Sequence, residues 1–580
     1  MVAPRPALQA LFAVLLLYLA LLSTPSCQAG EIRYYDTFDP ARVPWEPDEE
    51  KNIEEVFKNY RYFSIERDDD RLAVTEYLHG RAEPVQQYRI DSTGRLQKAG
   101  TVSRAGAAET AAGLYAQHCS ACHGADRTGG TGPALLPESL ARLKRKAARD
   151  VIRNGRTATR MPAFGGKVDA AGIATLVDYI YTPDPDLPDW NAQRIRASWH
   201  LYHAPGSLPD KPVFSADPLN LFMVVEAGDH HVTVLDGDRF EPVFRFPTHY
   251  ALHGGVKFSP DGRYAYLASR DGWITSFDLY NLKTVAEIRA GINTRNVAVS
   301  GDGATLMVAN YLPETLVALD AADLSLIKVI PVRDAGGRKS RVSAVYQAAP
   351  RASFIAALKD VPELWEIGAR APDFPVRRVH LKRPLDDFFF DQGYRLVIGA
   401  DRAQQGGQVV DLDTGRQVAK LALNGMPHLG SGITWQYQGR PVLATPNLGH
   451  GEITVIDMQT WKVIRRIPMP GPGFFLRSHE NTPYAWADVF SGPDRDVMVV
   501  IDKRTLEPVR KLRPAPGKTS AHVEFTRDGR FALVSIWDME GALVVYDAAT
   551  LQEIKRLPMR KPSGKYNVYN KIERSAGTSH

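Results

Sequence analysis

The feature that most constrains the fold is a repeat in the second two-thirds of the chain. Each unit contains an apolar run that ends in an acidic residue followed by a polar turn, as in "TSFDLYNL", "TVIDMQTW" and "VVYDAATL". Successive markers lie 42 to 46 residues apart. The eight markers are Asp236, Asp278, Asp320, Glu366, Asp411, Asp457, Asp502 and Asp547.

Several units also contain a strand–turn–strand pattern, such as "FSPDGRYAYLAS" and "FTRDGRFALVSI", with Asp-Gly at the turn. Four strands in about 40–45 residues is the spacing of a β-propeller blade. The eight units therefore predict an eight-bladed β-propeller over residues 206–580, closed in a ring that removes the sheet edges. A propeller by itself does not specify a function.

A second motif lies upstream, in "YAQHCSACHGADRTGG". Cys119, Cys122 and His123 form the CxxCH pattern of a covalent c-type haem attachment site. A redox dithiol or a chance match is the alternative interpretation. In haem c, His123 is one axial ligand of the iron, and Met161 in "TRMPAFGG" is the candidate for the other. The alternative for Met161 is a core methionine.

The surrounding residues predict a helical, class I-type cytochrome c domain over residues 101–183. The segment "AAETAAGLYAQHC" has the composition of a helix leading into the haem site. In "DAAGIATLVDYIY", four apolar residues recur at helical spacing and predict one buried face. These are Ile173, Leu176, Val177 and Ile180. The chain is thus expected to combine an α domain with an all-β domain.

The first 29 residues have the pattern of a secretory signal peptide, with an apolar run from Ala7 to Leu22 and cleavage expected after Ala29. The run is shorter than the roughly 20 apolar residues of a membrane span. Cys27 as a lipidated residue is an alternative, although the residues before it fit a lipidation signal poorly. We therefore predict a periplasmic protein without stable membrane insertion.

Two segments carry no recognisable chemistry. Residues 30–100 predict a small N-terminal extension of mixed α/β type that contains hairpin strands, and residues 184–205 predict a linker rich in Pro, Asp and Trp. The net charge of +5 on 580 residues is mild and gives no reason to expect nucleic-acid binding.

The phase of the repeat locates a candidate site. His253, Arg295 and His428 each lie 17 residues after a marker, and a second group lies 20 to 22 residues after theirs. That group is Arg341, Asp387, His479 and His522. These positions fall where the outer strand of one blade has ended and the innermost strand of the next begins. Imidazoles bind haem iron and arginines pair with carboxylates, so the cluster predicts a noncovalent tetrapyrrole site at one channel mouth. Any single histidine could instead be an ordinary hydrogen-bonded residue.

A cytochrome c domain followed by such a propeller resembles the cytochrome cd1 family, whose propeller binds haem d1. The likeness covers residues 105–580 and rests on "THYALHGGVKFSPDGRYAYL", "GINTRNVAVS", "MPHLGSG" and "PSGKYNVYN". Nitrite-reducing members carry two histidines above the iron. Here "KDVPEL" and "PLDDFF" place Lys359 and Asp386 at those positions. Nitrite reduction needs protons delivered to the leaving oxygen, so the departure argues against it.

The chain resembles more closely the dihydro-haem d1 dehydrogenase branch, through "ADPLNLFMVVEAGDHHVTVLDGDRFEP", "RSHENTPYAW" and "GKTSAHVEFTRDGR". This resemblance implies that a propionate side chain of dihydro-haem d1 becomes the acrylate, the last step of haem d1 biosynthesis, with haem c taking the electrons. It also implies roles for six residues. His253 and His522 would ligate the d1 iron, His428 would accept a side-chain proton, and the carboxylates would be bound by Arg295, Arg341 and Arg477.

The expected partners are dihydro-haem d1 as substrate, a soluble periplasmic electron acceptor, and the cd1 nitrite reductase as recipient of the product. Three alternatives stay open at this point. A nitrite reductase with substituted proton donors would turn over nitrite. A haem d1 carrier would not need the haem c. Plain electron transfer with an empty propeller would leave the histidine cluster without a purpose.

Overall fold

The computed structural model describes the five strands within residues 32–98 and residues 104–574, apart from 131, 141–142, 156–160, 185–189, 253–254 and 402–405. The predicted signal peptide, with Cys27, lies outside the described residues. From residue 221 onward, the described chain forms antiparallel sheets whose strands are joined by turns and loops.

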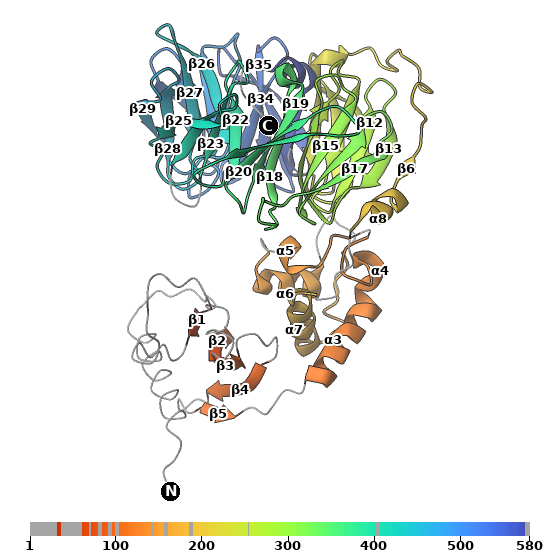
Figure 1. Ribbon diagram of the computed structural model, residues 1–580. Helices are drawn as coiled ribbons and strands as arrows, with labels where there is room; N and C mark the ends of the chain where they lie inside the picture. Colours follow the sequence, from red (N-terminus) through yellow and green to blue (C-terminus); the bar gives the residue numbers. More distant parts are fainter. Residues whose placement is uncertain are drawn as a thin grey trace. The chain divides into compact units, whose positions relative to one another are not determined.

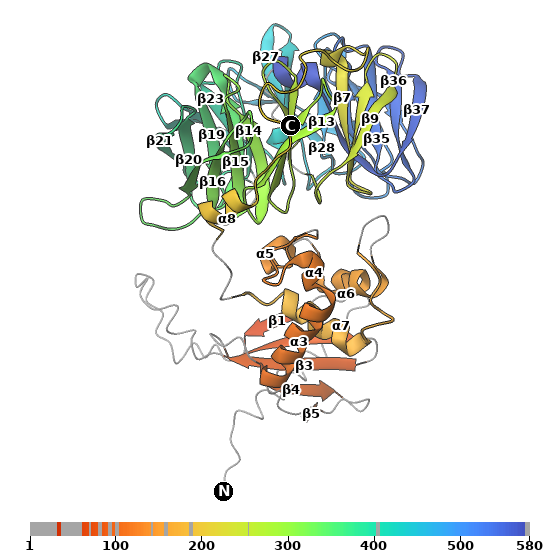
Figure 2. The same ribbon diagram turned by 90° about the vertical axis from the view of Figure 1, so that its right-hand side faces the viewer.

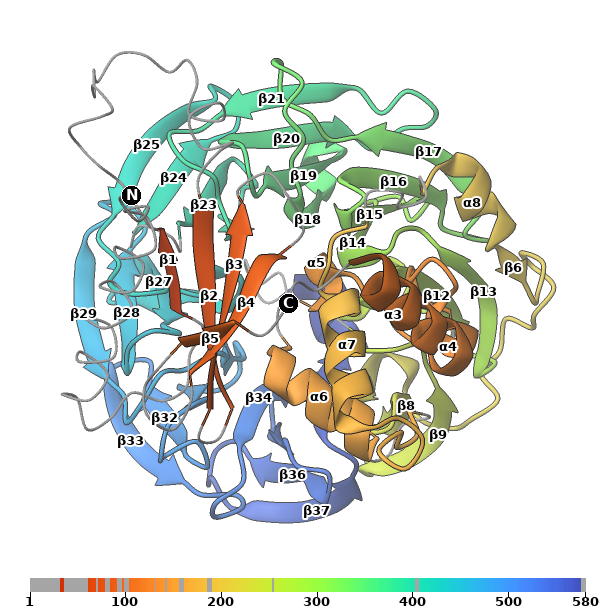
Figure 3. The same ribbon diagram turned by 90° about the horizontal axis from the view of Figure 1, so that it is seen from below.

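Eight sheets form the predicted eight-bladed propeller (Figures 1 and 3). The first blade contains β10 (Lys257–Phe258), β11 (Tyr264–Ala268), β12 (Trp273–Asp278) and β13 (Lys283–Arg289), and the second contains β14 (Asn293–Val299), β15 (Thr305–Leu312), β16 (Thr315–Asp320) and β17 (Leu326–Pro331). The third blade contains β18 (Val342–Ala348), β19 (Ser353–Leu358), β20 (Glu363–Gly368) and β21 (Val376–His380). The fourth contains β22 (Asp387–Phe390), β23 (Leu396–Ala400), β24 (Gly407–Asp411) and β25 (Arg416–Leu421).

In the next three blades the strands are β26 (Ile433–Tyr437), β27 (Arg440–Pro446), β28 (Glu452–Asp457), β29 (Val463–Pro468); β30 (Leu476–Ser478), β31 (Tyr484–Asp488), β32 (Met498–Asp502), β33 (Glu507–Leu512); β34 (Ser520–Phe525), β35 (Phe531–Ile536), β36 (Gly541–Asp547) and β37 (Glu553–Met559). Short 3-10 turns are η1 (Pro218–Asn220), η2 (Ala349–Arg351) and η3 (Leu429–Ser431), and η4 (Asn570–Arg574) is a π-helical turn. In Figure 3, the first strands β14, β18 and β34 lie nearer the centre of the ring than the later strands of their blades.

The eighth blade joins the two ends of the propeller sequence. Its innermost strand β38 (Pro562–Asn567) pairs with β7 (Leu221–Glu226), which is followed by β8 (His231–Asp236) and β9 (Glu241–Pro247). In this antiparallel pairing Asn567 lies opposite Phe222. Figure 2 shows β7 and β9 beside the strands β35–β37 of the preceding blade. The last strand of the chain therefore closes the ring.

The marker acids of the repeat act as turn-forming residues between the third and fourth strands of their blades. Asp457 accepts hydrogen bonds at Oδ1 from the amides of Gln459 and Thr460, each at 2.8 Å. Asp547 forms the same pair of bonds two and three residues ahead. Such Asx turns are a local alternative to further strand pairing. Glu366 differs, since it lies inside β20 and binds two arginines, Arg351 and Arg377.

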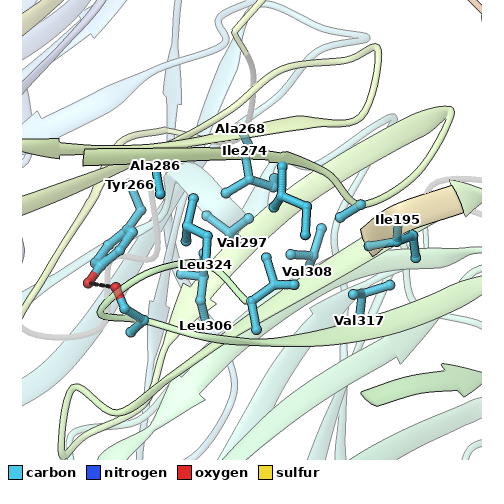
Figure 4. Packing of buried hydrophobic residues seen from close by; sticks show 14 of the residues in the cluster. Ile195, Tyr266, Ala268, Ile274, Ala286, Val297, Leu306, Val308, Val317 and Leu324 are labelled. Carbon is cyan, nitrogen blue, oxygen red and sulfur yellow. Dashed lines mark hydrogen bonds between the residues drawn. The ribbon is translucent and has the colours of Figure 1, made fainter. Parts of the chain in front are cut away.

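Apolar side chains from neighbouring blades interdigitate to form the core. One cluster joins the first two blades and includes Tyr266, Ile274, Val297 and Val308, all at most 1 % exposed (Figure 4). Figure 4 also shows the hydroxyl of Tyr266, which donates to the carbonyl of Ala321 at 2.9 Å. Burial of this kind, at about 25 cal/mol per Å² of apolar surface, is the main stabilising contribution to such a fold.

The segment expected as a linker takes part in the propeller. It contains α8 (Ala192–Ala197) and β6 (His200–Leu201). Ile195 of α8 is 1 % exposed within the apolar cluster of the first two blades (Figure 4), and Trp190 packs into the same cluster. Strand β6 pairs with β13 and adds a fifth strand to the first blade. Residues 190–201 are therefore fixed to the propeller.

The haem-attachment region is helical, as predicted. Its helices are α3 (Arg104–His118), α4 (Ser120–His123), α5 (Pro137–Leu140), α6 (Arg145–Asn154) and α7 (Ala170–Ile180). The predicted apolar face of α7 is buried along its length, with all four expected residues at most 4 % exposed. The Asp169 side chain caps α7 by accepting from the amide of Gly172 at 2.7 Å.

The N-terminal extension contains a single antiparallel sheet. Its strands follow one another in sequence order as a meander: β1 (Ile32–Tyr35), β2 (Arg61–Asp68), β3 (Arg71–Leu78), β4 (Pro84–Ile90) and β5 (Leu96–Lys98). The expected hairpin strands correspond to β3 and β4, whose pairing aligns Leu72 with Ile90.

Candidate functional site

The CxxCH motif forms a compact site around one imidazole. Cys119 precedes the short helix α4, and His123 ends it with 7 % of its surface exposed. Cys119 and Cys122 are not joined in a disulfide. The Nδ1 atom of His123 lies 2.7 Å from the carbonyl of Pro133. A proton on Nδ1 leaves the lone pair on Nε2, the arrangement found in metal-ligating histidines.

The loop that follows is shaped around this ring. At Gly132, an added Cβ would lie 2.8 Å from Cε1 of His123, so only glycine allows the loop to approach so closely. The buried Arg127 ties the loop to the end of α7 by donating to the carbonyls of Tyr179 and Thr182. Burial lowers the pKa of His123, which keeps the ring neutral and suited to iron. The residues present thus fit a covalently attached haem.

Met161 lies in the described segment that joins α6 to α7 and is partly buried. Residues 156–160 before it are outside the described residues. The assignment of Met161 as the second axial ligand stays a prediction.

In the propeller, the predicted rim residues occupy the starts of innermost strands. Asp387 begins β22, His428 precedes β26, and His522 is the third residue of β34. His428 is 2 % exposed. Its Nδ1 donates to the carbonyl of Phe474 at 2.7 Å, and its Nε2 lies 3.5 Å from the buried carboxylate of Asp387.

His522 has an unusual backbone. Its φ of 53° lies in the left-handed region, which non-glycine residues seldom adopt. The pairing of β34 with β35 shifts register between Ala521 and Val523, so His522 is the extra residue of a β-bulge. Bulges of this kind redirect a side chain. Here the bulge lies at the blade end where the sequence predicts the site.

Two buried charged residues hold this bulge. Lys565 of β38 is completely buried, and its Nζ donates to the carbonyl of His522 and, at 2.8 Å, to the hydroxyl of Ser535. Asp488 accepts the amide hydrogen of His522 at 3.4 Å. Burial raises the pKa of Asp488 to about 6. The neighbouring blades therefore fix the backbone of His522 from both sides.

The imidazole of His522 is neutral at pH 7. Burial, and then the nearby cations Lys565, Arg477 and Lys571, hold its pKa well below the ordinary histidine value. Its Nδ1 has no hydrogen-bond partner among the described residues. The ring packs against Phe475 and Tyr566, with centroids 4.6 and 5.4 Å away.

One dipeptide connects the two histidines. The Phe474 ring contacts His428 at 4.3 Å, and the Phe475 ring contacts His522. The amides of both phenylalanines donate to Oδ1 of Asp488, at 2.7 and 3.0 Å. The structure therefore brings His428 and His522 to a common site, one on each side of Phe474–Phe475.

The three predicted arginines differ in their surroundings. Arg295 of β14 donates from Nε to the carbonyl of Ser343 at 2.9 Å. Arg341 is more exposed and forms a paired ion contact with Asp360, with the shorter N–O distance at 2.6 Å. Arg477 is 4 % exposed, and burial lowers its pKa.

Charges near these arginines decide what each can bind. Burial acts to lower the pKa of Arg295, but Tyr311, Tyr346 and the carboxylates of Asp387 and Asp386 raise it overall. Arg477 is close to Glu524, Tyr566 and Asp488. A carboxylate ligand would have to replace Asp360 at Arg341. Arg477 is one of the cations that lower the pKa of His522, and Arg295 interacts with Asp387, the carboxylate beside His428.

Lys359 and Asp386 form an ion pair with each other. Each side chain is about a quarter exposed, and the Lys359 ammonium also lies 5.8 Å from the centre of the Tyr311 ring. Lys359 and Asp386, which the resemblance sets at the histidine positions of nitrite-reducing members, are thus paired with each other.

Two histidines of the predicted cluster are not placed in it. His253 lies outside the described residues. His479 follows the end of β30, at the opposite end of the innermost strand, and packs against Gly529 in the β34–β35 turn. The prediction that His479 joins the channel-mouth ring is therefore wrong. It lies later in the repeat than the other positions, and β30 is only three residues long.

Several residues of the site escaped the sequence analysis. Lys565, Asp488 and Tyr566 surround His522, and Phe474 and Phe475 connect it to His428. Two of them, Lys565 and Tyr566, belong to "PSGKYNVYN", the segment that contains β38. Ring closure places that motif beside His522, and sequence spacing alone gives no sign of it.

Among the helices of the described residues, none combines the length and the apolar character needed to cross a bilayer.

Comparison with known proteins agrees with this architecture. Residues 216–571 match the family described as "Cytochrome D1 heme domain", and residues 106–180 match "Cytochrome C oxidase, cbb3-type, subunit III". The dihydro-heme d1 dehydrogenase of Pseudomonas aeruginosa is 60% identical over 482 residues, which covers 83% of this chain and 98% of that protein.

Other relatives are more distant. A nitrite reductase of Stutzerimonas stutzeri is 26% identical over 523 residues, covering 79% of this chain and 92% of that protein. Protein NirF of P. aeruginosa is 31% identical over 367 residues, which cover 60% of this chain and 90% of that protein. Among solved structures, dihydro-heme d1 dehydrogenase NirN in complex with DHE superposes with a TM-score of 0.79 at 60% identity, covering 80% of this chain and 100% of that one.

Proposed function

The chain belongs to the cytochrome D1 heme-domain family, in its dihydro-heme d1 dehydrogenase branch, and from this we propose that it converts a propionate side chain of dihydro-haem d1 to the acrylate. The reaction removes two hydrogens from adjacent carbons as two protons and two electrons. The observation that carries the proposal is the 60% identity that extends over 98% of a dehydrogenase of this name.

The site supports this chemistry in three ways. The buried pair of histidines around Phe474–Phe475 offers one imidazole for the iron of the substrate and one for a proton. Arg477 near His522, and Arg295 near the Asp387 carboxylate that adjoins His428, offer guanidinium groups suited to the substrate carboxylates. Haem c, held by Cys119, Cys122 and His123, supplies one-electron acceptance when bound.

Two assignments of the histidines follow from their surroundings. In the first, His522 and His253 ligate the iron and His428 is the base. After His428 accepts a proton at Nε2, the carboxylate of Asp387, 3.5 Å away, stabilises the charge. In the second, His428 is the ligand and His522 the base. The bond from Nδ1 of His428 to the Phe474 carbonyl favours this second assignment, because metal-ligating histidines usually donate their other nitrogen in this way.

The experiment adds dihydro-haem d1 anaerobically to the full-length protein carrying haem c, and follows the absorption of both pigments. We expect acrylate formation together with reduction of haem c. Absence of conversion by protein that binds the tetrapyrrole would refute the dehydrogenase assignment. Steady nitrite turnover would indicate the reductase instead, which the Lys359–Asp386 ion pair disfavours.

The variants His428→Ala and His522→Ala separate the two histidine assignments. The base variant keeps the bis-histidine spectrum and loses conversion by about 10²–10⁴-fold, and the ligand variant loses that spectrum. His479→Ala is the matched control, because His479 is equally buried but lies at the other end of its strand. We expect it to bind and convert the substrate as the unmodified protein does.

We propose that the protein is periplasmic and that its haem c passes electrons to a soluble periplasmic acceptor. We also propose that the finished haem d1 is transferred to the cd1 nitrite reductase. The predicted signal sequence in residues 1–29 supports the location. The haem c supports the acceptor, because it must be reoxidised twice for each substrate molecule.

A further inference from the structure

We propose that Arg289 is a positioning residue that holds the haem-attachment loop against the first propeller blade and thereby sets the reduction potential of haem c. The inference rests only on the haem c assignment within the proposed function. Arg289 is the last residue of β13 and has 5 % of its surface exposed.

The guanidinium of Arg289 contacts both parts of the chain at once. On the blade side, its Nε donates to the carbonyl of Asp271 at 2.8 Å. On the loop side, Nη2 donates to the carbonyl of Thr128 and Nη1 to the carbonyl of Gly129 at 3.4 Å. The guanidinium carbon also lies 4.7 Å from the centre of the Trp190 ring. A planar fork can satisfy such a set of acceptors, and a lysine cannot.

The loop residues that Arg289 holds lead directly to the proximal histidine. The amide of Gly129 donates to the carbonyl of His123 at 2.8 Å. The amide of Gly132 donates to the carbonyl of Cys122 at 2.8 Å, and Pro133 accepts from Nδ1 of His123. Any shift of Gly129 is therefore transmitted to the backbone of His123 and to the acceptor of its ring proton.

Apolar packing also holds the haem-attachment loop against the propeller. Ala134 and Leu136, which follow Pro133, are 2 % and 1 % exposed. They belong to the apolar cluster of the first two blades, together with Ile288 and Ala290 on either side of Arg289. The hydrogen-bond acceptor of the haem ligand is thus followed by residues that pack with the propeller core.

The charge of Arg289 predicts whether its removal raises or lowers the reduction potential of haem c. Arginine stays protonated even where burial lowers its pKa, as it does here. A buried cation near the iron favours the reduced form, which carries one positive charge less, and exclusion of water acts in the same direction. Removal of Arg289 should therefore lower the haem c potential.

The hydrogen bond from Arg289 to the carbonyl of Asp271 connects the haem-attachment loop, through neighbouring backbone bonds, to the predicted tetrapyrrole site. Asp271 adjoins Arg270, whose amide donates to the carbonyl of Ala251 at 3.1 Å. The carbonyl of Arg270 accepts from the amide of Thr294 at 3.1 Å. Ala251 lies two residues before the predicted ligand His253, and Thr294 precedes Arg295. We therefore expect tetrapyrrole binding to change the haem c potential through Arg289.

The first test is a spectroelectrochemical titration of haem c in the full chain without tetrapyrrole. We expect Arg289→Met to lower the midpoint potential, and Arg289→Lys to lower it less because the charge remains. Arg263→Met is the matched control. Arg263 belongs to the same blade, pairs with Asp278 at 3.0 Å and contacts the Tyr264 ring, but lies at the opposite end of the blade. Its loss should leave the potential unchanged.

If Arg289→Met does not fold, amide hydrogen exchange in Arg289→Lys provides the second measurement. In Arg289→Lys, the amides of Gly129 and Gly132 should exchange faster than in the unmodified protein. Unchanged potential and unchanged exchange in a folded Arg289 variant would overturn the proposal.

The second test repeats the titration after loading with haem d1. The unmodified protein should show a shift of the haem c potential on loading, and Arg289→Met a smaller one. Equal shifts in both proteins would overturn the coupling. Because the first titration needs no tetrapyrrole, its result does not depend on whether dihydro-haem d1 is the substrate.

Discussion

At the scale of single residues, the geometry of the site depends on buried charges that touch backbone. Lys565 gives the clearest prediction, since its Nζ donates to the carbonyl of His522. In Lys565→Met, that carbonyl and the hydroxyl of Ser535 lose their donor, which costs about 1–3 kcal/mol for a buried unsatisfied group. The left-handed backbone of His522 then relaxes. We expect weaker tetrapyrrole binding or slower conversion in a folded protein.

Lys503→Met is the control for this prediction. Lys503 makes the same kind of bond, from Nζ to the carbonyl of His479 at 2.9 Å, but at the other end of the propeller blades. We expect a smaller loss of stability, because Lys503 is only partly buried, and unchanged absorption spectra of the bound tetrapyrrole. Equal effects of the two substitutions on the spectrum would contradict the role of Lys565.

The buried histidines also predict a pH dependence of stability. The pKa of His522 is depressed in the folded chain, so the unfolded chain binds more protons below about pH 6.5. Folding stability therefore falls as the pH decreases through that value. The raised pKa of Asp488 acts in the opposite sense, but only below about 6.

Denaturant unfolding between pH 7.5 and 6 measures this effect. The unfolding midpoint, followed by near-ultraviolet circular dichroism, should decrease on acidification, and His522→Phe should reduce the slope. A His522→Phe protein with an unchanged slope would show that other groups, such as His479 with its similarly lowered pKa, cause the dependence.

At the scale of elements, the closing strand decides whether the ring is stable. Strand β38 supplies the innermost strand of the eighth blade, and Val568 after it is fully buried. Truncation after residue 561 removes this strand and exposes the edge of β7. We expect destabilisation beyond the roughly 4–5 kcal/mol that single substitutions seldom exceed, measured as a lower melting temperature.

Truncation after residue 574 provides the control for this experiment, because it leaves β38 and η4 in place. We expect that shorter deletion to leave the melting temperature unchanged. A stable, cooperative protein without β38 would contradict the closure argument.

The elements also show what could be predicted from sequence. The number of blades could be predicted because seven of the eight units place an aspartate at the same turn position, where an Asx turn requires it, and Glu366 occupies the corresponding position in the remaining unit. The buried face of α7 could be predicted from the helical spacing of its apolar residues. The positions of Arg295, Asp387, His428 and His522 at the starts of innermost strands followed from the same period.

What the sequence could not provide depends on contacts between distant residues. Lys565 and His522 are neighbours only because the ring closes. The bulge at His522 is a local register shift without a signature in the apolar pattern. His479 was misplaced because the phase argument assumes innermost strands of equal length, and β30 is short. The role of Arg289 was hidden for the same reason, since its loop partners lie 160 residues earlier.

At the scale of the whole molecule, the haem-attachment loop and the propeller form one continuous structure. Trp190, Ile195, Ala134 and Leu136 share an apolar cluster with the first two blades. A redox protein built in this way does not need a separate docking event for each electron, because the contact already exists within one chain.

Ring closure by the last strand has a consequence for biogenesis. A ribosome completes the CxxCH segment 439 residues before it reaches the first residue of β38. At about 5–20 residues per second, this gap lasts tens of seconds. During that time the eighth blade lacks its inner strand, and the pocket that includes His522 and Lys565 does not yet exist. The nascent chain therefore cannot capture free tetrapyrrole at the propeller before β38 emerges, whereas the cysteines for covalent haem are made early.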